Sequence, residues 1–189
     1  MQVFLGGLLS GCLSQPVGPS VEPSDSEVST SPDMTACVNE EDGYAVSYPS
    51  GWHTNPVTET YAPCSYFDPA EVTLAQLDAS ADRLRPDPHE RPAISLAVLG
   101  GGQGYASGGE QTSFEEIEVA GQPATRFEEV AVPGSIMAPG ERAYVVRVSF
   151  GAGSLIARTP SSAASNAEEY DDQKAVLDTI VSTLQFGDP

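Results

Sequence analysis

The sequence predicts an α+β domain in which an antiparallel β-sheet of about six strands packs against helices, the last of them C-terminal. Three observations predict this fold class. Apolar and polar side chains alternate over 44–48 and again over 144–150, as in half-buried strands. A glycine-containing turn, 151–153, joins the second run to another apolar run, which indicates a hairpin. Near the C-terminus the apolar positions change to helical spacing, so a helix is expected to pack on the sheet.

Residues 1–11 are expected to be a lipoprotein signal peptide. Their apolar run, 3–9, is too short to span a bilayer. The run ends in Leu9-Ser10-Gly11-Cys12, which resembles the bacterial lipobox, the motif whose cysteine thiol is acylated before cleavage. The resemblance implies that a lipid on Cys12 holds the protein at the extracytoplasmic face of the cell membrane. The alternative is a free cysteine buried in an apolar segment.

Residues 12–36 are expected to form a disordered tether. Prolines alternate there with serine, threonine and acidic residues, and no aromatic residue occurs between positions 14 and 35. Such a stretch cannot bury enough apolar surface to offset the entropy of ordering. The segment would act as a spacer between the lipid and a folded domain, 37–188.

The charge of the chain limits its partners. The sequence has 27 Asp and Glu against 8 Lys and Arg, a net charge of −19. A surface this acidic repels nucleic acid, and it repels anionic lipid headgroups as well. Membrane attachment therefore has to come from the lipid on Cys12 rather than from a basic patch.

Two of the three cysteines remain when Cys12 is assigned to the lipid. A disulfide between Cys37 and Cys64 is the natural use of this pair in an oxidising, exported compartment. The alternatives are two free thiols or metal ligands. The sequence has only two histidines, His53 and His89, and no Cys-x-x-Cys, so no metal and no cofactor is expected.

The first half of the domain is predicted to hold two strands and one short helix. In the strand 44–48, Pro49 stops the ladder, 50–51 turn the chain, and Trp52 closes the end of the sheet. Leucines at helical spacing indicate a helix within 70–84, and three prolines make 85–92 a loop. The strand 94–99 is apolar on both faces, which predicts a central position between two layers.

The second half is predicted to hold a glycine-rich connector, two hairpins and the helix. The connector, 100–109, lacks the spacing of a phosphate-binding loop and is expected to be mobile. One hairpin joins 115–119 to 123–130, and the other joins 144–150 to 154–159. Ser165 and Glu168 form a capping-box pattern at the start of the helix. The apolar stripe of the helix comprises Tyr170, Leu177, Ile180, Val181 and Leu184.

The order of these elements resembles the PsbP-like family and the actinobacterial lipoproteins of the LpqN type. The resemblance rests on the Tyr48-Pro49-Ser50-Gly51-Trp52 turn, the 119–124 turn, the alternating hairpin and the helix 176–186. It implies an α/β/α arrangement, with the antiparallel sheet between helical layers. It also implies a binding or adaptor module without catalytic residues.

Two functions are consistent with the sequence. The favoured one is a non-catalytic, lipid-anchored module that binds a protein or a cell-envelope ligand through loops at one end of the sheet, with Trp52, His53 and Tyr105 as the expected contacts. The alternative is a secreted hydrolase that uses two carboxylates on envelope or extracellular glycans. No Gly-x-Ser-x-Gly motif is present, and no carboxylate pair stands out among the 27 acidic residues.

Overall fold

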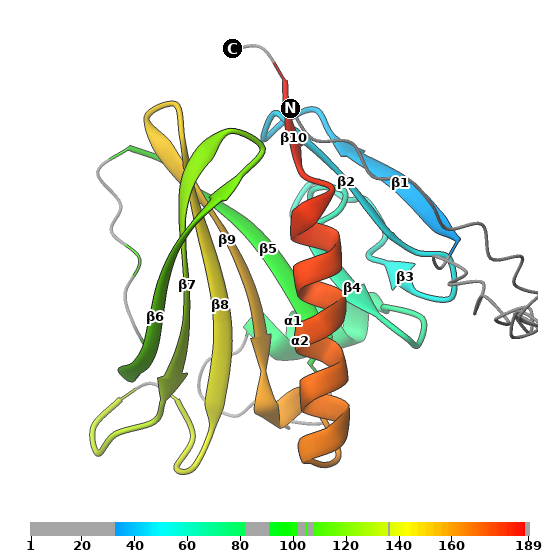
Figure 1. Cartoon of the computed structure of the whole chain (residues 1–189). Helices are drawn as coiled ribbons and strands as arrows, with labels where there is room; N and C mark the ends of the chain where they lie inside the picture. Colours follow the sequence, from blue (N-terminus) through cyan, green and yellow to red (C-terminus); the bar gives the residue numbers. More distant parts are fainter. Residues whose placement is uncertain (1–32, 82–90, 102–104, 106–107, 136, 188–189) are drawn as a thin grey trace, which may run out of the picture. The chain divides into compact units, whose positions relative to one another are not determined.

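The computed structural model describes residues 33–81, 91–101, 105, 108–135 and 137–187 (Figure 1). The predicted signal peptide, Cys12, most of the tether and His89 lie outside these residues. The described part consists of antiparallel sheets and helices, so the α+β fold class is confirmed. The strands are β1 (Met34–Asn39), β2 (Tyr44–Pro49), β3 (His53–Thr54), β4 (Tyr66–Asp68), β5 (Ile94–Leu99), β6 (Glu110–Val119), β7 (Gln122–Val130), β8 (Arg142–Phe150), β9 (Gly153–Pro160) and β10 (Gln185–Phe186). The helices are α1 (Leu74–Ala81), α2 (Ala167–Ser182) and the 3₁₀ helix η2 (Ser161–Ala163).

The smaller sheet has three strands in the order β1-β2-β10. Tyr44, Val46 and Tyr48 of β2 are buried, which confirms the alternation predicted for this strand. β1 pairs along the whole of β2, beginning at Met34, so the domain starts before the predicted boundary at Cys37. Most side chains of β1 are solvent-exposed, because it is an edge strand, and its composition therefore does not distinguish it from the tether.

The larger sheet has seven antiparallel strands in the order β3-β4-β5-β9-β8-β7-β6. It contains both predicted hairpins and the predicted strand 94–99. β6 begins at Glu110 rather than at residue 115, and its pairing with β7 has an irregularity between Gln111 and Ser113. The prediction of about six strands is low because it misses the short strands β3, β4 and β10 and the edge strand β1.

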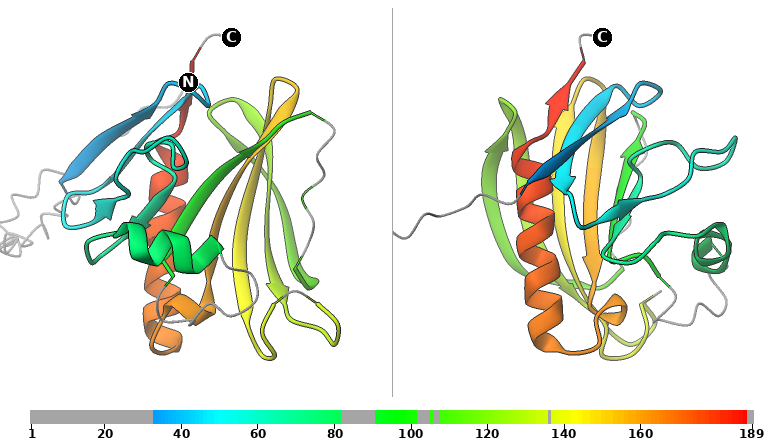
Figure 2. Two further views of the ribbon diagram at one scale, coloured as in Figure 1. Left: turned by 180° about the vertical axis from the view of Figure 1, so that it is seen from behind. Right: turned by 90° about the vertical axis from the view of Figure 1, so that its right-hand side faces the viewer.

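Helix α2 covers one face of the larger sheet, where it packs against β9 (Figure 1). It also packs against β2 of the smaller sheet. The five residues of the predicted stripe are buried, and Gln173 is buried with them. The helix is shorter than predicted, because α2 ends at Ser182: Leu184 follows it, and Gln185–Phe186 pair with β2 as strand β10. Helix α1 lies on the opposite side of the sheet from α2, as the two views in Figure 2 show. The expected arrangement of a sheet between helices, with the C-terminal helix packed on it, is thus confirmed.

The face of the sheet away from α2 has a second, smaller apolar cluster. It consists of Phe127, Met137, Ala143, Val145 and Ile156. Strand β5 is central in the sheet as predicted, but Ala97 on this face is exposed. The predicted layers on both sides of β5 are therefore complete only on the α2 face, where Ile94 and Leu96 are buried.

Two glycines, Gly101 of the connector 100–109 and Gly153 of the hairpin turn, are required by close packing. A Cβ atom at Gly101 would lie 2.6 Å from the carbonyl oxygen of Ala152, at the tip of the β8–β9 hairpin. Gly153, on the same hairpin, would bring a Cβ atom to 2.5 Å from the carbonyl oxygen of Leu99. Both distances are too short for any other residue, so glycine lets the end of β5 lie directly against the hairpin tip.

Candidate functional site

The disulfide predicted between Cys37 and Cys64 is present. The two sulfur atoms are 2.05 Å apart and the two Cα atoms 5.9 Å apart. Cys37 belongs to β1, at the edge of the smaller sheet, and Cys64 precedes β4 of the larger sheet. The bond therefore fastens one sheet to the other, and the hydroxyl of Tyr44 adds a buried hydrogen bond of 3.0 Å to the carbonyl oxygen of Cys64.

The structure does not bring the three predicted contact residues together. Trp52 packs against the core under α2, and His53 is exposed on β3, the first strand of the larger sheet. Tyr105 packs instead against the second apolar cluster, with its ring centroid 6.0 Å from that of Phe127 on β7. Sheet order separates β3 from β7 by four other strands. Whether any of the three binds a ligand stays a prediction.

Tyr105 has a structural partner of its own. Its hydroxyl donates to Oε2 of Glu129 over 3.0 Å, and Glu129 is fully buried. Burial raises the pKa of Tyr105, and the negative charge of Glu129 raises it further, so the phenol stays protonated and keeps donating. The hydroxyl of Tyr105 therefore provides a partner for one oxygen of a buried carboxylate, and the side chain does not project freely into solvent.

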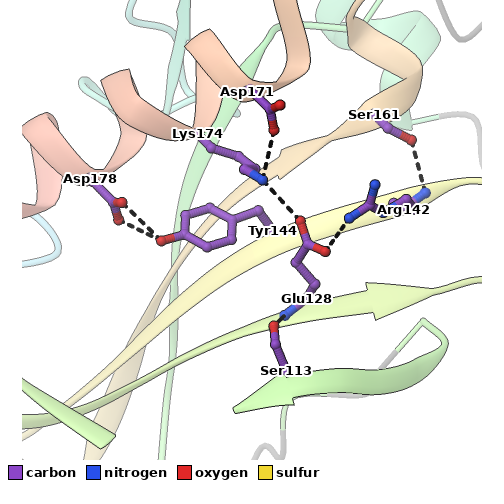
Figure 3. A network of polar contacts seen from close by, with 8 residues as sticks. All are labelled: Ser113, Glu128, Arg142, Tyr144, Ser161, Asp171, Lys174 and Asp178. Carbon is purple, nitrogen blue, oxygen red and sulfur yellow. Dashed lines mark hydrogen bonds and ion pairs between the residues drawn. The ribbon is translucent and has the colours of Figure 1, made fainter. Parts of the chain in front are cut away.

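The most extensive polar network joins α2 to the sheet (Figure 3). Lys174 of α2 donates to Oε1 of Glu128 over 3.2 Å and pairs with Asp171 over 2.9 Å. Arg142 of β8 donates to the other oxygen of Glu128. Partial burial by itself would raise the pKa of Glu128, but the hydrogen bonds from Arg142 and Lys174 outweigh it, and the pKa is lowered.

Two tyrosines line the same network. The hydroxyl of Tyr144 donates to Asp178 over 2.8 Å, and the Lys174 ammonium lies 5.7 Å from the Tyr144 ring centroid and 5.2 Å from that of Tyr170. Each charge thus has an opposite charge or a ring face as partner. The network therefore connects the helix to the sheet, and its charges are neutralised by one another.

The remaining described cations differ in how they are paired. Arg126 pairs with Glu115 and Asp178, and Arg91 pairs with the buried Glu141 over 3.3 Å. Arg147 on β8 and Arg158 on β9 differ from these, because within the part of the chain that the structure describes neither makes an ion pair. Nε of Arg147 donates a hydrogen bond of 3.2 Å to the hydroxyl of Ser154.

Arg147 borders two neighbouring grooves on the face of the sheet away from α2. Strand alternation places it opposite to Val146 and Val148, which belong to the core under α2. The larger groove, of about 440 Å³, is lined by Arg147 with Glu116, Thr125 and other residues of the β6–β7–β8 region. The smaller groove, of about 270 Å³, extends from Arg147 and Ser154 to the 151–153 turn and the end of β5.

The larger groove has opposite charges at its two sides. Glu116 lies directly opposite Thr125, and Thr125 lies directly opposite Arg147, on three neighbouring strands. The three side chains therefore share one face, with the neutral threonine between an acid and a base. Glu116 is the only carboxylate among the described lining residues of either groove, so neither presents the facing pair of carboxylates that a glycosidase needs.

Sequence reasoning missed this groove. The signal available was Arg147 itself, the one cation within 143–150, on the polar face of a strand in a very acidic chain. Its relation to Glu116 depends on the register of two hairpins and is not visible in the sequence.

No group of three or more His, Cys, Asp or Glu side chains in the described part of the chain is arranged to hold a metal ion. Within the same ranges, no helix is both long enough and apolar enough to cross a bilayer.

Comparison with known proteins finds similarity in structure only. No family model matches the chain, and no curated protein matches its sequence. The chain is similar to the solution structure of cyanobacterial PsbP (CyanoP) from Synechocystis sp. PCC 6803, with 13% identity and a TM-score of 0.48 over 95% of this chain and 99% of that one. It is also similar to a crystal structure from Bacteroides thetaiotaomicron VPI-5482, with 12% identity and a TM-score of 0.44 over 82% of this chain and 50% of that one. The expected resemblance to PsbP thus has a counterpart among solved structures, whereas the likeness to LpqN-type lipoproteins stays a prediction.

Proposed function

We propose that this chain is a lipid-anchored, extracytoplasmic binding module without catalytic activity. Its lipid is attached to Cys12, its tether separates the domain from the membrane, and its ligand contacts the face of the larger sheet that α2 leaves uncovered. The ligand is a protein or a component of the cell envelope.

The observation that carries the proposal is the disulfide between Cys37 and Cys64. Disulfides persist in oxidising compartments, so the bond supports export of the domain. It also uses two of the three cysteines, which leaves Cys12 in the lipobox-like motif as the one thiol available for acylation. The high negative charge opposes direct contact with anionic lipid, so attachment to the membrane depends on the lipid at Cys12.

The binding role is supported by the groove at Arg147. Ligand sites are concave and combine apolar walls with a few polar groups that fix orientation. The larger groove has a suitable volume and an arginine without an ion-pair partner among the described residues. In contrast, the polar network under α2 has its charges paired within the domain.

Mass spectrometry of the mature protein from its native host tests the attachment. We expect a chain that begins at Cys12 and carries acyl groups on that residue. A Cys12→Ala variant should lose the acyl groups and leave the membrane fraction. Wild-type protein that keeps residues 1–11 without acylation would overturn this part of the proposal.

Site-specific photo-crosslinking in intact cells tests the binding face. A photoreactive amino acid at Thr125, inside the groove, should form a discrete crosslinked product. The same amino acid at Glu168, which is exposed at the start of α2, is the matched control. Equal products from both positions, or products from Glu168 alone, would place the ligand elsewhere.

A further inference from the structure

We propose that the larger groove binds a short peptide as a zwitterion, with Arg147 holding the peptide carboxylate and Glu116 holding the ammonium group. This inference rests on the proposed binding function and specifies the chemical class of the ligand. Equally tight binding of a simple anion would contradict it.

Arg147 is suited to hold a carboxylate. Its hydrogen bond to Ser154 uses Nε and fixes one edge of the guanidinium. A guanidinium has five N–H donors, so four remain, and no described carboxylate is close enough to form an ion pair with them. The planar fork of these donors matches the two oxygens of a carboxylate.

Glu116 provides the opposite charge at a defined separation. It stands two strands away from Arg147 on the same face, with Thr125 between them. Two strand spacings place the backbones of the two residues about 9.5 Å apart. An extended tripeptide is about 10 Å long, so its two termini match this spacing.

The net charge of the chain distinguishes a zwitterion from an anion. At −19 the protein repels any ligand with net negative charge, and a single arginine offsets this repulsion only locally. A zwitterionic peptide has no net charge to repel, and it satisfies both Arg147 and Glu116. The volume of the groove, about 440 Å³, is within the range of small-ligand sites.

The experiment is a calorimetric titration of the purified full-length chain with trialanine at low salt. N-acetyl-trialanine lacks the ammonium group, trialanine amide lacks the carboxylate, and acetate supplies the carboxylate alone. We expect trialanine to bind about tenfold or more tightly than each of the other three, because each has lost at least one charge-assisted contact. Acetate that binds as tightly as trialanine would reduce the groove to a simple anion site and overturn the proposal.

Variants locate the binding. Arg147→Gln and Glu116→Gln should each weaken trialanine binding about tenfold. Glu118→Gln, which removes a neighbouring exposed carboxylate of β6 outside the groove lining, should not change it. If Arg147→Gln does not fold, Arg147→Lys keeps the charge without the fork and should still weaken binding severalfold.

Failure of this inference is distinguishable from failure of the proposed function. Absence of trialanine binding, or equal binding by the Arg147→Gln variant, overturns the peptide assignment. Crosslinking from Thr125 in cells would then still support a binding module with a different ligand. Absence of both would contradict the two proposals together.

Discussion

Lys174 on α2 donates to Glu128 on β7 over 3.2 Å, a contact between residues 46 positions apart in the chain. Glu128 also accepts a hydrogen bond from Arg142 on β8, so one carboxylate connects the helix to two strands. The side chain of Glu128 is only 15% exposed, which limits screening by water. We therefore expect this carboxylate to contribute more than a surface ion pair does.

The first prediction concerns the pH dependence of this contact. The pKa of Glu128 is lowered from 4.5 in the folded protein, so the stabilisation is fully present above about pH 4.5 and is lost as pH falls through the folded pKa. Glu128→Gln should lower the free energy of unfolding by about 1–2 kcal/mol at pH 7. Urea unfolding at a series of pH values should show this difference shrinking below pH 4.5.

Glu118→Gln is the control for the change in net charge, because Glu118 is an exposed residue of β6 whose carboxylate makes no ion pair within the described ranges. Its free energy of unfolding should stay close to that of the wild type at every pH. A Glu128→Gln difference that grows on acidification would contradict the assigned pairing.

The second prediction concerns Thr183 at the end of α2. Its hydroxyl accepts from the backbone N–H of Ser47 over 2.7 Å and can donate to the carbonyl oxygen of Ile180 or of Ser47. This one side chain therefore connects the helix terminus to β2. Thr183→Val keeps the shape but leaves the Ser47 N–H without a partner, and should lower the free energy of unfolding by about 1–2 kcal/mol.

Thr179→Val is the matched control. The hydroxyl of Thr179 is exposed and bonds only to the carbonyl oxygen of Ala175, within α2. Its loss should change stability by less than about 0.5 kcal/mol. Hydrogen exchange should also accelerate at Ser47 in the Thr183→Val protein alone; equal exchange in both variants would refute the connection.

The third prediction concerns the disulfide. Its cysteines are 27 residues apart, and in the chain-entropy model a loop of this length stabilises the fold by about 3.5 kcal/mol. Cys37→Ala with Cys64→Ala should lower the urea midpoint accordingly, and reduction of the wild type should have a similar effect. Reductant should not affect the double variant. A wild-type midpoint that reductant leaves unchanged would show that the bond does not contribute to stability.

Elements whose apolar residues repeat with a regular period within one segment could be predicted from the sequence. Alternation in β2 and β8 and the helical stripe of α2 are each contained in one segment, so periodicity was sufficient to predict them. The short strands β3 and β10 have two residues each and form only because a partner strand is present. Pairing of this kind depends on the tertiary fold and has no local signature.

The grouping of Trp52, His53 and Tyr105 at one end of the sheet was not predictable for a related reason, and their role as ligand contacts stays a prediction. Exposed loop aromatics are a sound basis for predicting contacts, but Trp52 and Tyr105 are both packed against apolar clusters. The pairing of β5 with β9, across more than fifty intervening residues, determines which loops meet. The Glu116 and Arg147 groove likewise arises from register, which a sequence does not display.

The final prediction distinguishes two residues at the start of α2. The sequence pattern indicates Ser165 and Glu168 as the capping box, but the structure places it one residue later. The side chain of Asn166 accepts from the backbone N–H of Glu169 over 3.0 Å, and Glu169 accepts in return from the backbone N–H of Ser165 over 2.7 Å. Asn166→Ala should therefore lower the free energy of unfolding by about 1 kcal/mol.

Ser165→Ala should have almost no effect, because Ser165 takes part through its backbone N–H, which alanine retains. Chemical denaturation of the two variants side by side distinguishes the alternatives. If Ser165→Ala were the more destabilising change, the helix would begin where the sequence pattern predicted. Asn166 has this role because the chain is extended there, with φ −158° and ψ 176°, which directs its short side chain back over the first turn.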